Sequence, residues 1–319
     1  MNQKPLISIC IPTYNRSHYL KECLDTIVLQ FDNETVKNSV QVIISDDASS
    51  DNTKELAESY QARFNNITYF KNKENLGMDG NIANSVLKAN GKYCWHIGDD
   101  DIIQNGALDL IIKILTKKEV ALLTVNFYPF IDIKKASERK VFGNDYAVEY
   151  IYSAEEFCDK CYSQGFLGIF IFNKELWLNI DKKNYEKFWS WLEFIFKMIG
   201  TTRLPLAHLK TPVLFIGQDY RWNENGGALF CTIHIKRVFD KLQEFGYSKN
   251  FVNNNINILS KSLPRALLTA KSYDLKWSFD NLFFIYKEFY RYPIQLFLTT
   301  LIFFIPNYFL KIAKKIKKI

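Results

Sequence analysis

The chain has 319 residues, 48% of them hydrophobic and 16% aromatic, so it can bury the core of one large domain with a smaller extension. Its 13 glycines and 8 prolines are too few for a collagen-like or linker-rich protein. The formal net charge of +7 includes five lysines near the end: Lys311, Lys314, Lys315, Lys317 and Lys318. The remaining chain carries only +2, which argues against a nucleic-acid partner and favours an anionic surface contacted by this tail.

The first 130 residues alternate short apolar runs with amphipathic stretches, a pattern typical of strands separated by helices. Strands are predicted at residues 6–12, 40–45, 67–70, 92–98 and 120–130. Because parallel neighbours require a crossover connection, this order predicts an α/β fold of the Rossmann-like, nucleotide-binding kind with a largely parallel sheet.

The second half of the sequence, after about residue 150, is more helical and more aromatic in pattern. An amphipathic helix is predicted at residues 188–198, and residues 165–168 are predicted to form a turn. The expected organisation is a main domain at residues 1–225, with a nucleotide-binding part at 1–130 and an acceptor part at 131–225, followed by a helical C-terminal region at 226–319.

Polar residues follow three of the predicted strands, where ligands bind in α/β sheets. The triplet Asp99, Asp100 and Asp101 ends a buried run and suits a hard divalent ion such as Mg2+ or Mn2+, although capping of the next helix is an equal alternative. Asp46 ends another strand, where its carboxylate can accept hydrogen bonds from a base or ribose. Together with residues 12–16 after the first strand, both acidic ends are expected to line one crevice.

Six cysteines occur, and the N-terminal sequence lacks the pattern of a signal peptide, so a reducing cytoplasm is expected. Cys158 and Cys161 form a single CxxC motif. Since a zinc site needs two further ligands at suitable spacing, two thiols on one helix is the favoured interpretation.

The chain resembles the family 2 glycosyltransferases of the GT-A fold over roughly residues 5–130, in the motifs ICIPTYNR, VIISDDASSDNT, ENLGMDGNIANS and ANGKYCWHIGDDD. The last motif is also similar to bacterial transferases of O-antigen assembly, including abequosyltransferases. The resemblance implies a nucleoside-diphosphate-sugar donor, an Mg2+ or Mn2+ cofactor and inversion at the anomeric carbon.

Site roles follow from the same resemblance. It implies that the nucleotide is bound by Pro12, Thr13, Asn15, Asp46, Lys73 and Asp100. The metal ligands would be Asp101 and Asp99, and Gly98 stands where many relatives have a further aspartate.

A catalytic base is expected in the second half, where a carboxylate would take the proton of the acceptor hydroxyl. Glu193 is the candidate, because nearby aromatic rings such as Trp191 can raise its pKa and offer flat faces to a sugar. The alternative is a solvated glutamate on a helix surface. Arg221 and Trp222 belong to a QxxRW pattern and are further acceptor candidates.

The segment at residues 292–310 has no charged residue and leads into the lysine tail. Pro306 is expected to kink or end a helix there. An anchor lying in the plane of an anionic membrane is therefore favoured over a membrane span, with a buried C-terminal helix as the third reading.

The first strand lacks a glycine-rich turn and the chain lacks a phosphate loop, which excludes a nicotinamide dehydrogenase and an ATPase. The expected function is an inverting, metal-dependent, non-processive glycosyltransferase of lipopolysaccharide or capsule biosynthesis. Its acceptor would be a polyprenyl-diphosphate-linked saccharide at the inner face of the cell membrane. The alternative is a non-catalytic relative that binds a glycan or a membrane surface.

Overall fold

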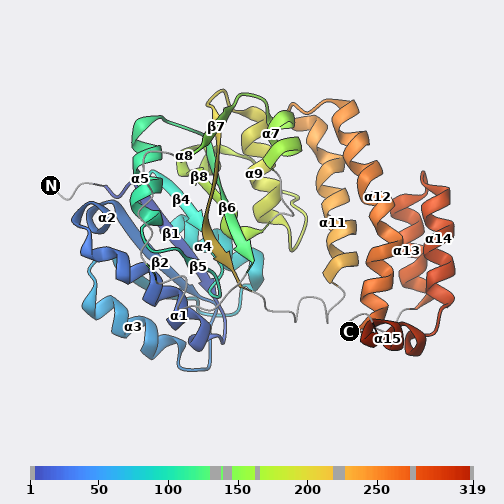
Figure 1. Cartoon of the computed structure of the whole chain (residues 1–319), viewed down its shortest axis with the longest axis horizontal. Coiled ribbons are helices and arrows are strands. Elements are labelled where there is room, and N and C mark those ends of the chain that lie inside the picture. The colour runs from blue at the N-terminus through green and yellow to red at the C-terminus, as the bar shows by residue number, and fades with distance from the viewer. Residues whose placement is uncertain are drawn as a thin grey trace. The chain divides into compact units, whose positions relative to one another are not determined.

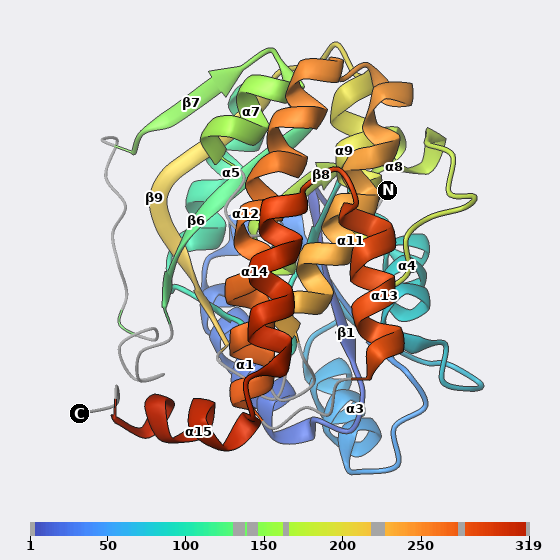
Figure 2. The same ribbon diagram turned by 90° about the vertical axis from the view of Figure 1, so that its right-hand side faces the viewer.

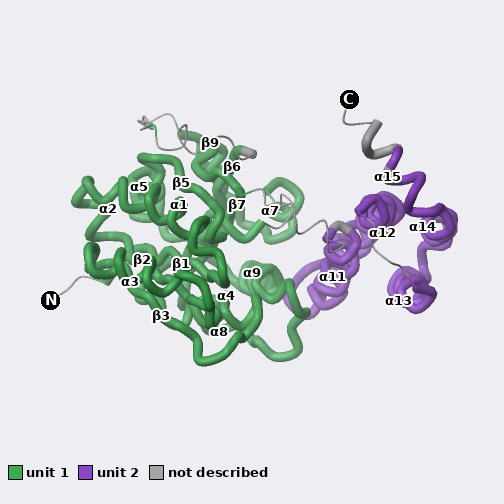
Figure 3. The backbone as a smooth tube through the Cα atoms, turned by 90° about the horizontal axis from the view of Figure 1, so that it is seen from below, with its two compact units in different colours: residues 1–218 green, residues 219–319 purple. Residues whose placement is uncertain are grey.

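The computed structural model describes residues 4–129, 138, 146–161, 166–217, 227–273 and 278–316. The chain divides into two compact units, residues 1–218 and residues 219–319 (Figure 3). Unit 1 contains the sheet with its helices, and the described elements of unit 2 are helical.

The N-terminal part of unit 1 is an alternating series of strands and helices (Figure 1). Its elements are β1 (Ile7–Thr13), α1 (Ser17–Val28), η1 (Leu29–Asp32), α2 (Glu34–Ser39), β2 (Val40–Asp46), α3 (Thr53–Arg63), β3 (Ile67–Lys71), α4 (Gly77–Lys88) and β4 (Tyr93–His96). The strands lie in the order β3-β2-β1-β4 and are parallel. Ile9, Cys10 and Ile11 are consecutive and fully buried, so β1 is covered on both faces, as parallel strands usually are.

The sheet continues beyond β4 with strands of both directions. The further elements of unit 1 are β5 (Ile102–Ile103), α5 (Ala107–Lys117), β6 (Leu122–Pro129), β7 (Val148–Ile151), α7 (Ala154–Cys161), η2 (Leu167–Ile169), β8 (Phe170–Asn173), α8 (Lys174–Asn179), α9 (Ser190–Thr201) and β9 (Leu206–Ile216). β8 pairs antiparallel with both β4 and β6, and β9 pairs parallel with β6 and antiparallel with β5 and β7. The α/β fold predicted from the sequence, with parallel strands in its N-terminal part, is confirmed.

All five predicted strands are present, and the chain after about residue 150 is more helical, as expected, although the strands β7, β8 and β9 were not predicted. β7 and β8 have four residues each, too few for a strand alternation to be recognised. Pro212 interrupts the pattern of β9, where the register against β6 shifts. The predicted helix at 188–198 corresponds to α9, and Cys158 and Cys161 lie together in α7 as expected.

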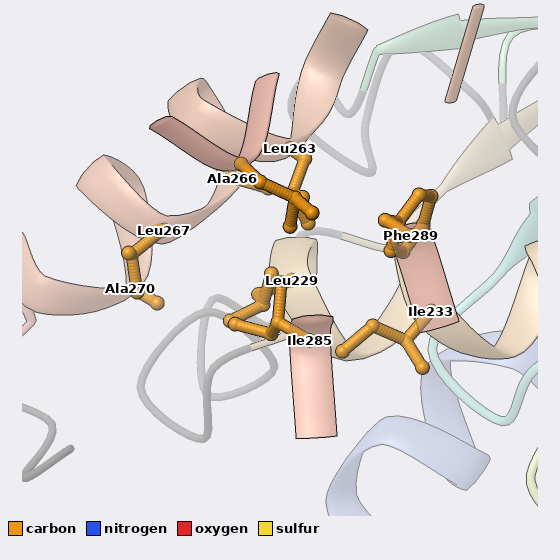
Figure 4. Packing of buried hydrophobic residues seen from close by; sticks show 9 residues of the cluster. Leu229, Ile233, Leu263, Ala266, Leu267, Ala270, Ile285 and Phe289 are labelled. Carbon is orange, nitrogen blue, oxygen red and sulfur yellow. The ribbon is translucent and has the colours of Figure 1, made fainter. Parts of the chain in front are cut away.

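Unit 2 consists of α11 (Gly227–Lys241), η3 (Leu242–Phe245), α12 (Lys249–Ser272), α13 (Phe279–Phe289), α14 (Pro293–Phe304) and α15 (Asn307–Ile316). Its core is a cluster of apolar side chains drawn from the four helices α11 to α14 (Figure 4). The cluster comprises Leu229, Ile233, Leu263, Ala266, Leu267, Ala270, Ile285, Phe289 and Leu296.

The expected effect of Pro306 is confirmed, because α14 ends at Phe304 and α15 starts at Asn307. Ile305, directly before the proline, has the extended conformation that a following proline favours (φ −70°, ψ 124°). Across the residues the structure describes, we find no helix with the length and apolarity needed to cross a bilayer.

Candidate active site

The carboxyl ends of β1, β2 and β4 meet at one edge of the sheet. Thr13 at the end of β1 lies opposite Asp46 at the end of β2, and Cys10 lies opposite His96 at the end of β4. The acidic loop, residues 97–101, follows β4 at this edge. A hydrogen bond from the Thr13 hydroxyl to Asp99 joins β1 to this loop, so the strand ends converge as predicted.

Asp99 is held by two residues that follow or end β1. The Thr13 hydroxyl donates a hydrogen bond to Asp99 Oδ2 (2.7 Å), and Arg16 Nε lies 3.3 Å from Asp99 Oδ1. Burial raises the pKa of Asp99 to about 7, although the Arg16 charge and the Thr13 hydrogen bond act in the opposite direction. Thr13 and Arg16 thus favour the charged carboxylate that burial disfavours.

Arg16 also pairs with Asp100, with Nη2 2.9 Å from Oδ2. The same guanidinium lies over the Tyr19 ring, 4.6 Å from its centroid. This planar group thus spaces two neighbouring carboxylates, which a lysine ammonium does less well.

Asp101 is fixed by backbone groups. Gly98 N–H donates to its Oδ2 (2.7 Å), and Gly217 N–H, directly after β9, donates to its Oδ1 (3.2 Å). Burial, then the negative charge of Asp100, raises the pKa of Asp101 to about 7. Gly217, directly after β9, therefore contributes to the site at the ends of β1, β2 and β4.

Two glycines allow this close approach. A Cβ atom at Gly168 would lie 2.6 Å from Asp101 Oδ2, and one at Gly217 would lie 2.6 Å from both the backbone oxygen and Oδ2 of Asp100. No larger residue fits without displacing the acidic loop. These two positions were not predicted as site residues, because their neighbours come from distant parts of the chain.

The acidic loop suits a hard divalent cation by its chemistry. It carries three carboxylates, of which Arg16 pairs with two, so negative charge is in excess. Within the described ranges, no group of three or more His, Cys, Asp or Glu side chains is arranged to hold an ion alone. One or two carboxylates are sufficient for Mg2+ or Mn2+ where substrate phosphates supply other ligands, so the residues present fit such an ion.

The Asp46 carboxylate, predicted to contact the base, is buried and already bonded. Its Oδ1 accepts from the Ser49 N–H (2.8 Å) and its Oδ2 from the Tyr69 hydroxyl (2.7 Å). Burial and this hydrogen bond raise the pKa of Tyr69 above its usual range. Each carboxylate oxygen has a second lone pair, so Asp46 retains the capacity to accept from a ligand.

The loops after β1 and β2 are joined directly. Asn15 has a left-handed backbone (φ 52°), and its Oδ1 accepts from the Ser50 N–H (2.7 Å) while its own N–H donates to Ser49 Oγ (2.8 Å). The predicted nucleotide residue Pro12 is half-buried beside this junction, whereas Lys73 is exposed on the segment after β3. Asn15 therefore holds the shape of the loops that carry Thr13 and Asp46.

Asn81 of α4 is a further positioning residue that the sequence did not single out. Its Nδ2 donates to the Ser45 carbonyl (2.9 Å) and its Oδ1 accepts from Ser45 Oγ (2.7 Å). A polar residue on the buried side of a helix was the available signal.

Glu193 does not have the open position that a catalytic base needs. Its side chain is 0% exposed, its Oε1 lies 2.7 Å from Lys197 Nζ, and its Oε2 accepts from the Glu186 N–H (2.7 Å). It is not a solvated glutamate either, so both sequence readings differ from the observed geometry. Trp191 is also buried, with its ring centroid 5.9 Å from that of Phe170.

Arg221 and Trp222, the remaining acceptor candidates, lie outside the described residues.

Solved structures share this fold. A mannosyltransferase, PcManGT from Pyrobaculum calidifontis in complex with GDP-Man and Mn2+, has a TM-score of 0.57 and 18% identity, covering 94% of this chain and 84% of that chain. Residues 1–349 of S. aureus TarS in complex with UDP have a TM-score of 0.55 and 16% identity, covering 84% and 80%. These likenesses show the fold of this chain, which is that of the GT-A glycosyltransferases.

The sequence matches Glycosyl transferase family 2 over residues 8–168. The chain belongs to this family, as the sequence resemblance predicted. It is similar to the abequosyltransferase RfbV of Salmonella typhimurium, with 29% identity over 280 residues and 81% of each chain covered. It is also similar to the GalNAc(5)-diNAcBac-PP-undecaprenol beta-1,3-glucosyltransferase of Campylobacter jejuni, with 33% identity over 110 residues and 34% of each chain covered.

Proposed function

We propose that this glycosyltransferase is inverting, metal-dependent and non-processive, and that it moves a sugar from a nucleoside-diphosphate donor to a lipid-linked saccharide in surface polysaccharide biosynthesis. The observation that carries the proposal is the acidic loop after β4, in which Thr13 and Arg16 hold Asp99 and Asp100. Such an arrangement collects negative charge where α/β sheets bind their ligands.

In this proposal the donor nucleotide lies against the loops after β1 and β2, with Asp46 accepting from the base and Asp100 from the ribose. Asp101 and Asp99 would hold the divalent cation, which when bound neutralises the departing diphosphate. Arg16, which pairs with Asp100, would add a fixed positive charge beside the same phosphates. We do not assign the catalytic base to Glu193, because its carboxylate is paired with Lys197 in a buried position.

The relatives support parts of this proposal. The Pyrobaculum mannosyltransferase binds GDP-Man with Mn2+, and TarS binds UDP, so both donor type and metal have precedents on this fold. The Campylobacter relative is named for an undecaprenyl-diphosphate-linked acceptor. A lipid-linked acceptor would explain the basic tail of this chain, which we propose holds the enzyme peripherally at the inner, anionic face of the membrane.

The test is a thermal-shift panel of nucleoside diphosphates with and without Mn2+, on the wild type, Asp101→Asn and the control Asp109→Asn. A ligand that binds only the folded state raises the melting temperature. We expect one base to give a Mn2+-dependent rise that Asp101→Asn abolishes and Asp109→Asn retains, since Asp109 lies on α5 and pairs with Lys113. No rise with any base would contradict the proposal and favour a non-catalytic glycan- or membrane-binding protein.

A further inference from the structure

Helix α13 exposes a row of aromatic side chains. Phe279, Phe283, Tyr286 and the C-cap residue Tyr290 follow one another at spacings of four, three and four residues, so they lie on one side of the helix. Phe283 is 71% exposed and Tyr290 65%. The opposite side carries Ile285 and Phe289 into the core of unit 2, so the exposed row lies outside this core.

Helix α14 repeats this arrangement. Its exposed row consists of Ile294, Phe297, Leu298, Leu301 and Phe304. Leu296 on the other side belongs to the core, and Phe303 packs against that core. The helix is therefore apolar on two sides, of which only one is covered.

The two rows adjoin. α13 and α14 lie side by side (Figure 2) and contact each other. Tyr286 Oη lies 2.6 Å from Thr300 Oγ1, and the Phe279 ring centroid lies 6.3 Å from that of Phe304. We call the combined surface the aromatic face: Phe279, Phe283, Tyr286, Tyr290, Ile294, Phe297, Leu298, Leu301 and Phe304.

A protein that makes no further contacts rarely exposes an apolar surface of this kind. More than half of the exposed large hydrophobic side chains in the described part of the chain fall between Phe279 and Ile312. Single exposed apolar residues are ordinary, but a continuous patch marks a contact surface for a protein or a membrane.

The charge of the sequence that follows α13 indicates which contact the aromatic face makes. No acidic residue follows Glu288 in the sequence, whereas Arg291 and the five lysines of the tail do. A second copy of this chain would bring the same positive charge against itself. An anionic lipid surface offers both an apolar interior and charge of the opposite sign.

We propose that the aromatic face enters the boundary between headgroups and acyl chains of an anionic bilayer, with α13 and α14 lying in the membrane plane. α14 has 12 residues, which is shorter than the roughly 20 needed to cross a bilayer. Exposed Tyr286 and Tyr290 suit the interface, because their rings are apolar and their hydroxyls polar. This membrane contact rests on the proposed function, in which the acceptor is a lipid-linked saccharide in the membrane. It adds an apolar contact to the attachment by the lysine tail.

The experiment measures co-sedimentation of the full chain with vesicles of phosphatidylcholine alone or mixed with phosphatidylglycerol. The test variant is Phe283→Ser with Phe297→Ser, and the matched control is Ile258→Ser, a 63% exposed apolar residue on α12 outside the aromatic face. We expect the double variant to bind mixed vesicles roughly tenfold or more weakly, because two phenyl rings no longer leave water. The control should bind like the wild type, with unchanged melting temperatures confirming folding in all three.

Failure of the wild type to bind mixed vesicles, or equal binding by the wild type and the double variant, would overturn the proposal. So would a wild-type dimer that the double variant converts to a monomer without loss of vesicle binding. The nucleotide panel on the same proteins separates the two proposals. If the wild type shows no Mn2+-dependent rise in melting temperature, the transferase site is contradicted, but the vesicle-binding result is unaffected.

Discussion

At the scale of single residues, Arg16 connects the loop after β1 to the acidic loop after β4. It contacts Asp99 and Asp100 together, at 3.3 and 2.9 Å. Arg16→Lys keeps the charge but loses the fork that spaces both carboxylates, so we expect kcat/KM to fall about tenfold or more. Arg63→Lys, an exposed arginine on α3, is the control and should retain activity. Wild-type kinetics in Arg16→Lys would show that charge alone is sufficient.

The buried Glu193 is expected to stabilise the fold through its pair with Lys197. Glu193→Ala leaves a buried ammonium without its partner, which costs about 3 kcal/mol of unfolding free energy. Urea unfolding measures this loss, and Glu156→Ala, which breaks an exposed pair with Lys160, should leave stability nearly unchanged. If Glu193→Ala were as stable as Glu156→Ala but inactive, the role of catalytic base would return to Glu193.

At the scale of elements, an ion pair connects α11 with α13. Arg237 Nη2 lies 2.7 Å from Glu288 Oε1, and Lys236 Nζ lies 3.4 Å from Oε2. Burial raises the pKa of Glu288, but the hydrogen bond and charge of Arg237 together with the charge of Lys236 outweigh it, so the pKa lies below its ordinary 4.5.

This pair should make stability depend on pH. A carboxylate whose folded pKa is lowered stabilises the fold above its unfolded pKa, and the contribution is lost as pH falls through the folded value. We therefore expect Glu288→Gln to be less stable than the wild type at neutral pH, with the difference shrinking below about pH 4.5. Urea unfolding at several pH values tests this, and a difference independent of pH would exclude the ionic origin.

The strands of unit 1 show which elements a sequence pattern identifies. β1 and β2 are long apolar runs bounded by polar residues, and both were predicted within one residue. β7 and β8 are too short to carry a periodicity, and their pairing with β9, β4 and β6 stabilises them instead. Such strands are recognised only when their partners are known.

At the scale of the whole molecule, the C-terminal segment has two parts with different roles. Leu296 of α14 belongs to the core of unit 2, and Lys271 Nζ of α12 donates to the Phe303 carbonyl (2.5 Å). α15 follows the break at Pro306, and its Tyr308 and Phe309 are exposed.

Truncation separates these parts. A chain ending at Phe304 should keep a melting temperature close to that of the full chain, whereas one ending at Arg291 should lose several degrees, because it uncovers the core around Phe289. Differential scanning calorimetry of both truncations measures the difference. Equal destabilisation by the two would mean that α15, not α14, closes the core.

The sequence alone determined the parts of this protein that depend on local pattern. The apolar runs of the parallel strands, the acidic triplet after β4 and the helix break at Pro306 are encoded by neighbouring residues, and each is present in the structure. The family could also be recognised, because its motifs are contiguous.

Only the tertiary structure decided which residues from distant segments meet. Gly168 and Gly217 pack against the acidic loop, although about 70 and 120 positions separate them from Gly98 in the chain, and no local pattern marks them. The burial of Glu193 and the exposure of Phe283 likewise depend on what neighbouring helices cover. An amphipathic period shows that a helix has two sides, but contacts between segments decide which of them water reaches.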